Sequence, residues 1–198
     1  VNKKINLSLK ADENIKIEGA VPSEIPADGS VTEIFIAKNS LALLGDVKEL
    51  TIYDAEILTG VKIIKAPSLK LLDISFSGLK NIEFVDCPAL ENLVFEGNKQ
   101  MNKPDFSSLS GLKILNIAGT TIQEMDFSLF PNLECLDISS VKLKTLDLTK
   151  SIELKELYCE NSGLNNLDLT KNIKLTHLNC RANKLTELAL FQNKELKF

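Results

Sequence analysis

Residues 143–190 read LKTLDLTKSIELKELYCENSGLNNLDLTKNIKLTHLNCRANKLTELAL, and this stretch decides the fold. It repeats the pattern apolar-x-x-apolar-x-apolar, which is most complete at Leu175, Leu178 and Cys180. Over the whole chain the pattern occurs seven times at intervals of 21 or 22 residues, beginning at Val47, Leu69, Leu90, Leu112, Leu133, Leu154 and Leu175. A fixed period in this range is typical of a solenoid, in which each unit buries its apolar face against its neighbours.

Each repeat also contains a second apolar half-motif, seen most clearly at residues 143–148, 164–169 and 185–190. Two extended segments within one period leave no room for a full α-helix and its connections. We therefore expect the convex side of each coil to be extended or 3₁₀-helical. The sequence predicts a right-handed solenoid with a parallel β-sheet on its concave side and few or no α-helices.

Residues 1–46 do not keep the period. Apolar and polar residues alternate there at Ile5, Leu7 and Leu9, which is typical of a strand, and the prolines and the Asp-Gly pair in residues 21–29 indicate turns. We interpret residues 1–46 as an N-terminal β-rich cap that covers the open edge of the first coil. Residues 47–198 then hold seven repeats and the start of an eighth.

The repeats resemble a known family. A Leu-x-Cys-x-x-Asn half at Leu178–Asn183 alternates with a Leu-Asp-Leu-Ser/Thr-x-Asn half at Leu167–Asn172. This alternation is similar to the leucine-rich repeats of secreted and surface-anchored Bacteroidetes proteins, which are distant relatives of the internalins. The resemblance covers about residues 47–195 and implies the α/β leucine-rich-repeat class. It also implies export and often a lipid anchor, neither of which the chain shows directly.

One departure from the family pattern concerns asparagine. The family's asparagine position holds Asn98 and Asn183, but other residue types in the remaining repeats. We therefore expect the ladder of asparagine side chains to be interrupted.

Charge and hydropathy exclude some partners. The chain has 23 basic and 27 acidic residues, although from Lys142 onward ten basic residues exceed seven acidic ones. Lysine and arginine do not cluster as a nucleic-acid interface requires, so we expect no nucleic-acid partner. No apolar run approaches the roughly 18 residues that a transmembrane helix needs.

The residues that could carry chemistry are few. The nearby carboxylate of the single histidine, His177, is Glu156 of the preceding repeat, and Ser139 and Ser140 lie two repeats away. No catalytic set converges, so we expect no enzymatic activity, cofactor or metal site. The four cysteines lack zinc or redox spacing. Cys159 and Cys180 share one inward position of consecutive repeats, either as small buried hydrophobic residues or as a disulfide between neighbouring strands.

The concave face is predicted to display the strand residues between the inward leucines. Leu71, Val94, Ile114 and Cys135 form an apolar diagonal there. Seven acidic residues face one arginine, Arg181, and they are Glu49, Asp54, Asp73, Glu96, Asp137, Glu156 and Glu160. The candidate partner-binding residues are Tyr53, Leu71, Asp73, Phe76, Val94, Glu96, Ile114, Asn116, Asp137, Tyr158, Glu160, His177 and Arg181.

These residues favour a module that binds a protein or peptide, with a cationic partner favoured by the acidic excess. The apolar diagonal can instead be covered by a loop or a neighbouring chain, and the acidic excess can serve solubility. A glycan-binding adhesin is the alternative, resting on Tyr53, Phe76 and Tyr158 for ring stacking. A spacer or a fragment of a longer surface protein is a third interpretation. The eighth repeat begins at Leu196 without a capping unit, so we also expect fraying or edge association at the last coil.

Overall fold

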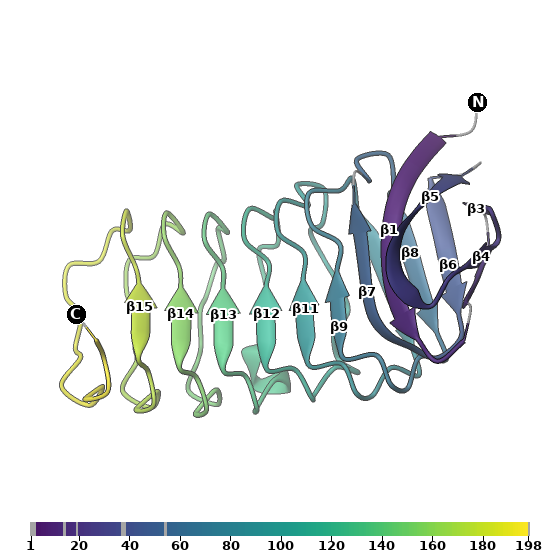
Figure 1. The fold of residues 1–198 in the computed structure, drawn as a ribbon. Helices are drawn as coiled ribbons and strands as arrows, with labels where there is room; N and C mark the ends of the chain where they lie inside the picture. The colour runs from purple at the N-terminus through teal and green to yellow at the C-terminus, as the bar shows by residue number, and fades with distance from the viewer. Residues whose placement is uncertain (1–2, 14, 19, 37–38, 54, 198) are drawn as a thin grey trace.

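The computed structural model describes residues 3–13, 15–18, 20–36, 39–53 and 55–197. These residues form an elongated stack of coils, with strand β1 at one end and the last strand, β15, near the other (Figure 1). Each coil contributes one short strand to a common sheet, and the strands stand side by side along the stack (Figure 1).

The main sheet has ten strands in the order β15-β14-β13-β12-β11-β9-β7-β1-β5-β3. Its seven repeat strands are β7 (Val47–Tyr53), β9 (Leu71–Asp73), β11 (Asn92–Val94), β12 (Ile114–Asn116), β13 (Cys135–Asp137), β14 (Glu156–Tyr158) and β15 (His177–Asn179). They pair in parallel and in register, and in β9, β11, β12, β13 and β14 a buried central leucine stands between two partly buried residues. This alternation follows from the two-residue period of a strand, which turns every second side chain inward.

The N-terminal strands close one end of this sheet. Strand β1 (Lys3–Ala11) pairs antiparallel with β7 on one side and with β5 (Asp28–Ile36) on the other, and β3 (Ala20–Val21) follows β5. Ile5, Leu7 and Leu9 of β1 are buried in the common core. The open edge of β7 is thereby covered.

A second sheet of five strands has the order β10-β8-β6-β2-β4. Its members are β2 (Ile15–Glu18), β4 (Glu24–Ile25), β6 (Ser40–Leu44), β8 (Gly60–Ile64) and β10 (Asn81–Val85). β6 pairs in parallel with β8, and β8 with β10, so this ladder runs across the boundary we place at residue 46. The division into cap and repeats therefore stays a proposal.

The convex side of the later coils consists mainly of turns. The one helix in the described part of the chain is a 3₁₀ helix, η1 (Phe127–Leu129), and no helix there is long and apolar enough to cross a bilayer. The predicted extended or 3₁₀ convex side is confirmed.

Short carboxylates hold these convex turns together. Each accepts hydrogen bonds from the amide and the hydroxyl of the Ser or Thr two residues later, and the four are Asp105, Asp126, Asp147 and Asp168. These bonds lower the pKa of the carboxyls of Asp105, Asp147 and Asp168. Glu83, at the related position of an earlier coil, forms an ion pair with Lys62 at 2.7 Å instead.

Asparagine connects neighbouring coils inside the core. The Asn98 Nδ2 donates to the carbonyls of Ile74 and Phe95 at 2.7 and 2.9 Å, and its Oδ1 accepts from the Ser77 hydroxyl and the Leu79 amide at 2.6 and 3.2 Å. Asn98 is fully buried. Because a buried carbonyl or amide without a partner is destabilising, one side chain here satisfies groups from two coils.

The ladder is interrupted, as the sequence predicts. Asn183 repeats the arrangement of Asn98 near the end of the stack. Between them, the hydroxyls of Thr120 and Ser162 each donate to a backbone carbonyl at 2.8 Å.

Candidate partner-binding site

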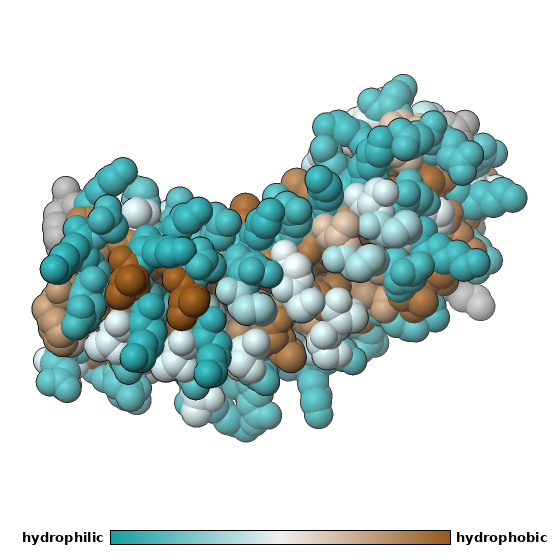
Figure 2. Space-filling view, turned by 90° about the horizontal axis from the view of Figure 1, so that it is seen from below, coloured by the Kyte–Doolittle hydropathy of each residue, from teal (hydrophilic) through white to brown (hydrophobic). Residues whose placement is uncertain are grey.

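Seen from below, the side of the molecule that carries the main sheet is in profile, and its outline curves inward between the two ends (Figure 2). The strand register places the side chains of this face in two rows that cross the coils. The first row is Glu49, Leu71, Asn92, Ile114, Cys135, Glu156 and His177. The second row is Thr51, Asp73, Val94, Asn116, Asp137, Tyr158 and Asn179.

The predicted apolar diagonal is a zigzag across these two rows. Ile114 and Cys135 are direct neighbours in the first row, whereas Asn92 separates Ile114 from Leu71. Val94 lies in the second row. The four apolar residues are partly buried, so they are less accessible than their positions in the sequence indicate.

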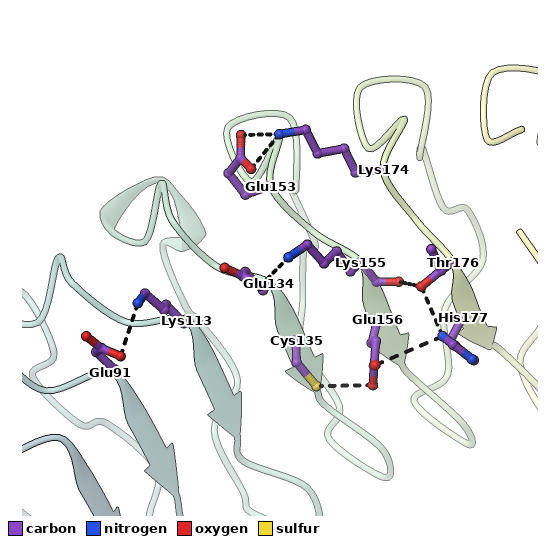
Figure 3. A network of polar contacts seen from close by, with 10 residues as sticks. All are labelled: Glu91, Lys113, Glu134, Cys135, Glu153, Lys155, Glu156, Lys174, Thr176 and His177. Atoms are coloured by element: carbon purple, nitrogen blue, oxygen red, sulfur yellow. Dashed lines mark hydrogen bonds and ion pairs between the residues drawn. The ribbon is translucent and has the colours of Figure 1, made fainter. Parts of the chain in front are cut away.

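The centre of the face is a depression of about 270 Å³ around Ile114 and Cys135. Its lining residues include Lys113, Glu134 and Lys155. Two ion pairs between neighbouring coils stand at this rim, Lys113 with Glu91 at 3.1 Å and Lys155 with Glu134 at 2.5 Å (Figure 3). The depression therefore has an apolar floor and a rim with two ion pairs that neutralise themselves. The Glu156 carboxylate also lines it and lies 4.0 Å from the ring of His177.

Some polar residues of the second row have a structural role that the sequence did not indicate. Asp73 accepts the amide of Ser75 at 3.0 Å, and Asp137 accepts the amide of Ser139 at 2.8 Å. Asn116 makes the same bond to the amide two residues later, at 2.9 Å. These bonds satisfy backbone donors where the strands end. The sequence signal for this structural role is an Asp or Asn at the last position of the strand, two residues before the amide that it accepts.

The other carboxylates of the face differ in their charge partners. Glu49 forms an ion pair with Lys10 at 2.7 Å, and Glu156 lies 4.0 Å from the ring of His177. Within the described residues, four carboxylates of the face have no ion pair, namely Asp73, Glu96, Asp137 and Glu160. Glu96 and Glu160 instead accept the amides of Asn116 and Asn179, at 3.5 and 2.9 Å. Asp54, which we counted among the acidic residues, lies outside the described residues.

The aromatic residues lie at different depths. Tyr53 is 44% exposed and Phe76 is 65% exposed. Tyr158 is partly buried, and its hydroxyl donates to the Glu156 carboxylate at 3.0 Å. Arg181 is exposed at the C-terminal end of the face.

Comparison with known proteins shows the fold. No protein-family model matches the sequence, and no match is found among curated proteins. Among solved structures, internalin C2 of Listeria monocytogenes is 16% identical with a TM-score of 0.60, over 76% of this chain and 78% of that one. Internalin InlF of the same organism is 20% identical with a TM-score of 0.51, over 72% of this chain and 47% of that one.

The chain has the leucine-rich-repeat fold. The functional domain of InlJ from Listeria monocytogenes is a further similar structure, 26% identical with a TM-score of 0.48, over 76% of this chain and 43% of that domain. The leucine-rich-repeat chain thus spans less than half of the InlF and InlJ structures.

The leucine-rich-repeat register also brings together three residues that resemble a catalytic set. Cys135, Glu156 and His177 follow one another in the first row, and the Cys135 Sγ lies 3.9 Å from a Glu156 carboxylate oxygen (Figure 3). In a working triad the imidazole stands between nucleophile and carboxylate, but here the carboxylate stands in the middle. Burial, together with the nearby Glu156, raises the pKa of the Cys135 thiol to about 11. The arrangement therefore does not activate the sulfur.

The cysteines of the leucine-rich-repeat core are free thiols, Cys159 and Cys180 included. Cys159 is fully buried in the core and packs as a small hydrophobic residue, and this burial raises its pKa to about 12. Among the described residues, no group of three or more His, Cys, Asp or Glu side chains is placed to hold a metal ion.

Proposed function

We propose that this chain is a non-catalytic leucine-rich-repeat module of a secreted or surface-anchored bacterial protein, and that it binds a protein or peptide on its concave face. The observation that carries the proposal is the depression around Ile114 and Cys135, which lies near the middle of the repeat strands. The location outside the cell rests on the resemblance of the repeats.

The chemistry of the face supports a protein ligand. A half-buried apolar centre surrounded by polar groups is the usual anatomy of a protein interface. The rim lysines are neutralised by Glu91 and Glu134, so the unpaired carboxylates of the face determine the sign of its field. Such a field attracts a cationic partner and speeds its association.

The test selects ligands and then makes two apolar residues of the first row polar. Random peptides displayed on phage are selected against the full chain, and the enriched peptides are measured by calorimetry. The double variant Leu71→Gln, Ile114→Gln removes apolar surface without adding charge, and it should weaken their binding by about tenfold or more, the size typical of interface centres. The matched control is Ile152→Gln, because Ile152 is 53% exposed and lies outside both rows of the face.

The control should bind as the parent chain does, and all three proteins should melt at similar temperatures. Equal binding by the parent and the double variant would refute the concave-face proposal. A substrate screen that finds turnover abolished in His177→Ala would refute the non-catalytic part.

A further inference from the structure

Phe76 is an outlier in a column of equivalent residues. In six consecutive coils, the residue three positions after the end of the sheet strand has a left-handed backbone, with φ of +50° at Phe76 and +73° at Gly97. The remaining members of the column are Gly119, Ser140, Asn161 and Ala182. These are small or polar residues, which are better suited to this conformation or to solvent than a bulky apolar residue. Phe76 is unfavourable for two reasons: its backbone is left-handed, and its apolar ring is 65% exposed.

The ring has a defined place on the neighbouring coil. A Cβ atom on Gly97 would lie 2.5 Å from the Phe76 Cδ1 and 2.9 Å from its Cε1, so the ring occupies the space that Gly97 leaves free. The Phe76 amide donates to the Glu96 carbonyl at 2.7 Å. The backbones of Phe76 and Glu96 are therefore neighbours in adjacent coils at the rim of the concave face.

The charge of Glu96 is not neutralised within the described part of the chain. Its carboxylate has a long contact to the Asn116 amide, at 3.5 Å, but no ion pair there. Elsewhere on the surface, glutamates such as Glu91, Glu134 and Glu153 are paired with a lysine of the next coil. A guanidinium group can stack on an aromatic ring and donate to a carboxylate at the same time. Here the exposed Phe76 ring lies against Gly97, the residue that follows Glu96.

We propose that Phe76 and Glu96 form a binding site for an arginine side chain of the partner. The guanidinium stacks on the exposed side of the Phe76 ring and donates N–H groups to the Glu96 carboxylate. Gly97 positions the ring by leaving space for it. This inference rests on the proposed function and specifies the chemistry of the cationic partner.

The test titrates the ¹⁵N-labelled full chain with N-acetylarginine amide and with N-acetylcitrulline amide, which has nearly the same shape without the charge. Arginine should shift the amide signals of Phe76, Glu96 and Gly97, and citrulline should not. Phe76→Leu should weaken arginine binding by about two- to fivefold, the worth of an exposed cation–π contact. Phe191→Leu is the control, because Phe191 is another exposed aromatic residue, at 70%.

A pair of glycine variants tests the positioning of the ring. Gly97→Ala and Gly119→Ala carry the same left-handed strain, but the nearest atom to the new Cβ at Gly119 is 3.7 Å away. Only Gly97→Ala should displace the ring and weaken arginine binding. Phe76→Gly should lose the binding while its melting temperature stays level or rises, because it relieves the backbone strain.

Three results would overturn the inference: equal shifts with citrulline, shifts confined to other parts of the chain, or a fall in melting temperature in Phe76→Gly. The last result would make the ring a structural element. Loss of the arginine site would leave peptide capture at Ile114 standing. Conversely, if the Leu71→Gln, Ile114→Gln variant loses peptide capture but still binds arginine, the concave-face centre and the arginine site are separate.

Discussion

Replacing Asn98 by alanine tests whether one side chain connects neighbouring coils. The substitution removes four buried hydrogen bonds, two to carbonyls and two to donors of the preceding coil. Each such bond contributes about 1 kcal/mol, and the groups left behind have no access to water. The Ser77 hydroxyl can partly compensate, since it already lies 3.4 Å from the Ile74 carbonyl. We therefore expect a loss of about 3–4 kcal/mol in the free energy of unfolding.

Asn183→Ala is the matched comparison. Asn183 makes the same kinds of bond, to the carbonyls of Cys159 and Cys180 and from the amides of Ser162 and Leu164. It is only partly buried, so water can replace the lost partners. We expect a loss of about 1 kcal/mol for this variant.

The assay is urea unfolding followed by circular dichroism, with thermal melting as a second measurement. For a chain of this size, 3–4 kcal/mol corresponds to a fall in melting temperature of roughly 6–16 °C. Equal losses in the two variants, or a loss below about 1 kcal/mol for Asn98→Ala, would refute the reasoning that burial sets the value of these bonds.

The other predictions concern ionisation and an unpartnered hydroxyl. Cys135 should react with iodoacetamide at pH 8 on the order of 100-fold more slowly than a free cysteine, because its raised pKa keeps the thiol protonated. Glu156→Gln should speed the reaction. Rapid labelling of the parent chain would contradict the raised pKa of Cys135. Stability should fall as the pH drops below about 4. A depressed carboxyl pKa stabilises the fold above the ordinary pKa of the group, and this stability is lost as the pH falls through the folded-state pKa. Unfolding measured against pH should show a weaker acid dependence in the triple alanine variant of Asp105, Asp147 and Asp168. Ser151→Ala should raise stability by about 1 kcal/mol, because the buried Ser151 hydroxyl has no partner among the described residues; a destabilised variant would indicate a partner.

The spacing of apolar residues was sufficient to predict the coils. Leu154 and Leu157, for example, are both buried. The repeat pattern turns their side chains inward, where the coils stack on one another. The same spacing excluded α-helices on the convex side, because two extended segments fill each period of 21 or 22 residues. The pairing of β6 with β8 was not predictable in this way, because residues 40–44 lie outside the 21-residue period.

The candidate site was harder to predict, because function there depends on contacts between coils. Asp73 and Asp137 look like ligands in the sequence, yet each accepts a backbone amide of its own turn. The offset of Val94 could be predicted, because Val94 is the fifth residue of its repeat whereas Leu71, Ile114 and Cys135 are third residues. Phe76 was identified as exposed, but its fit against Gly97 is a distance between two coils that no single repeat contains.

The lysine and glutamate pairs at the rim determine whether the stack tolerates the loss or gain of one coil or of two. Glu91, Lys113, Glu134 and Lys155 alternate in sign from coil to coil. Deleting the one coil that contains Glu134 would bring Lys113 beside Lys155, and like charges facing each other across a sheet are destabilising. Deleting two coils would bring Glu91 beside Lys155 and restore an attraction. Duplication or loss of repeats should therefore be tolerated better in pairs than singly at this part of the stack.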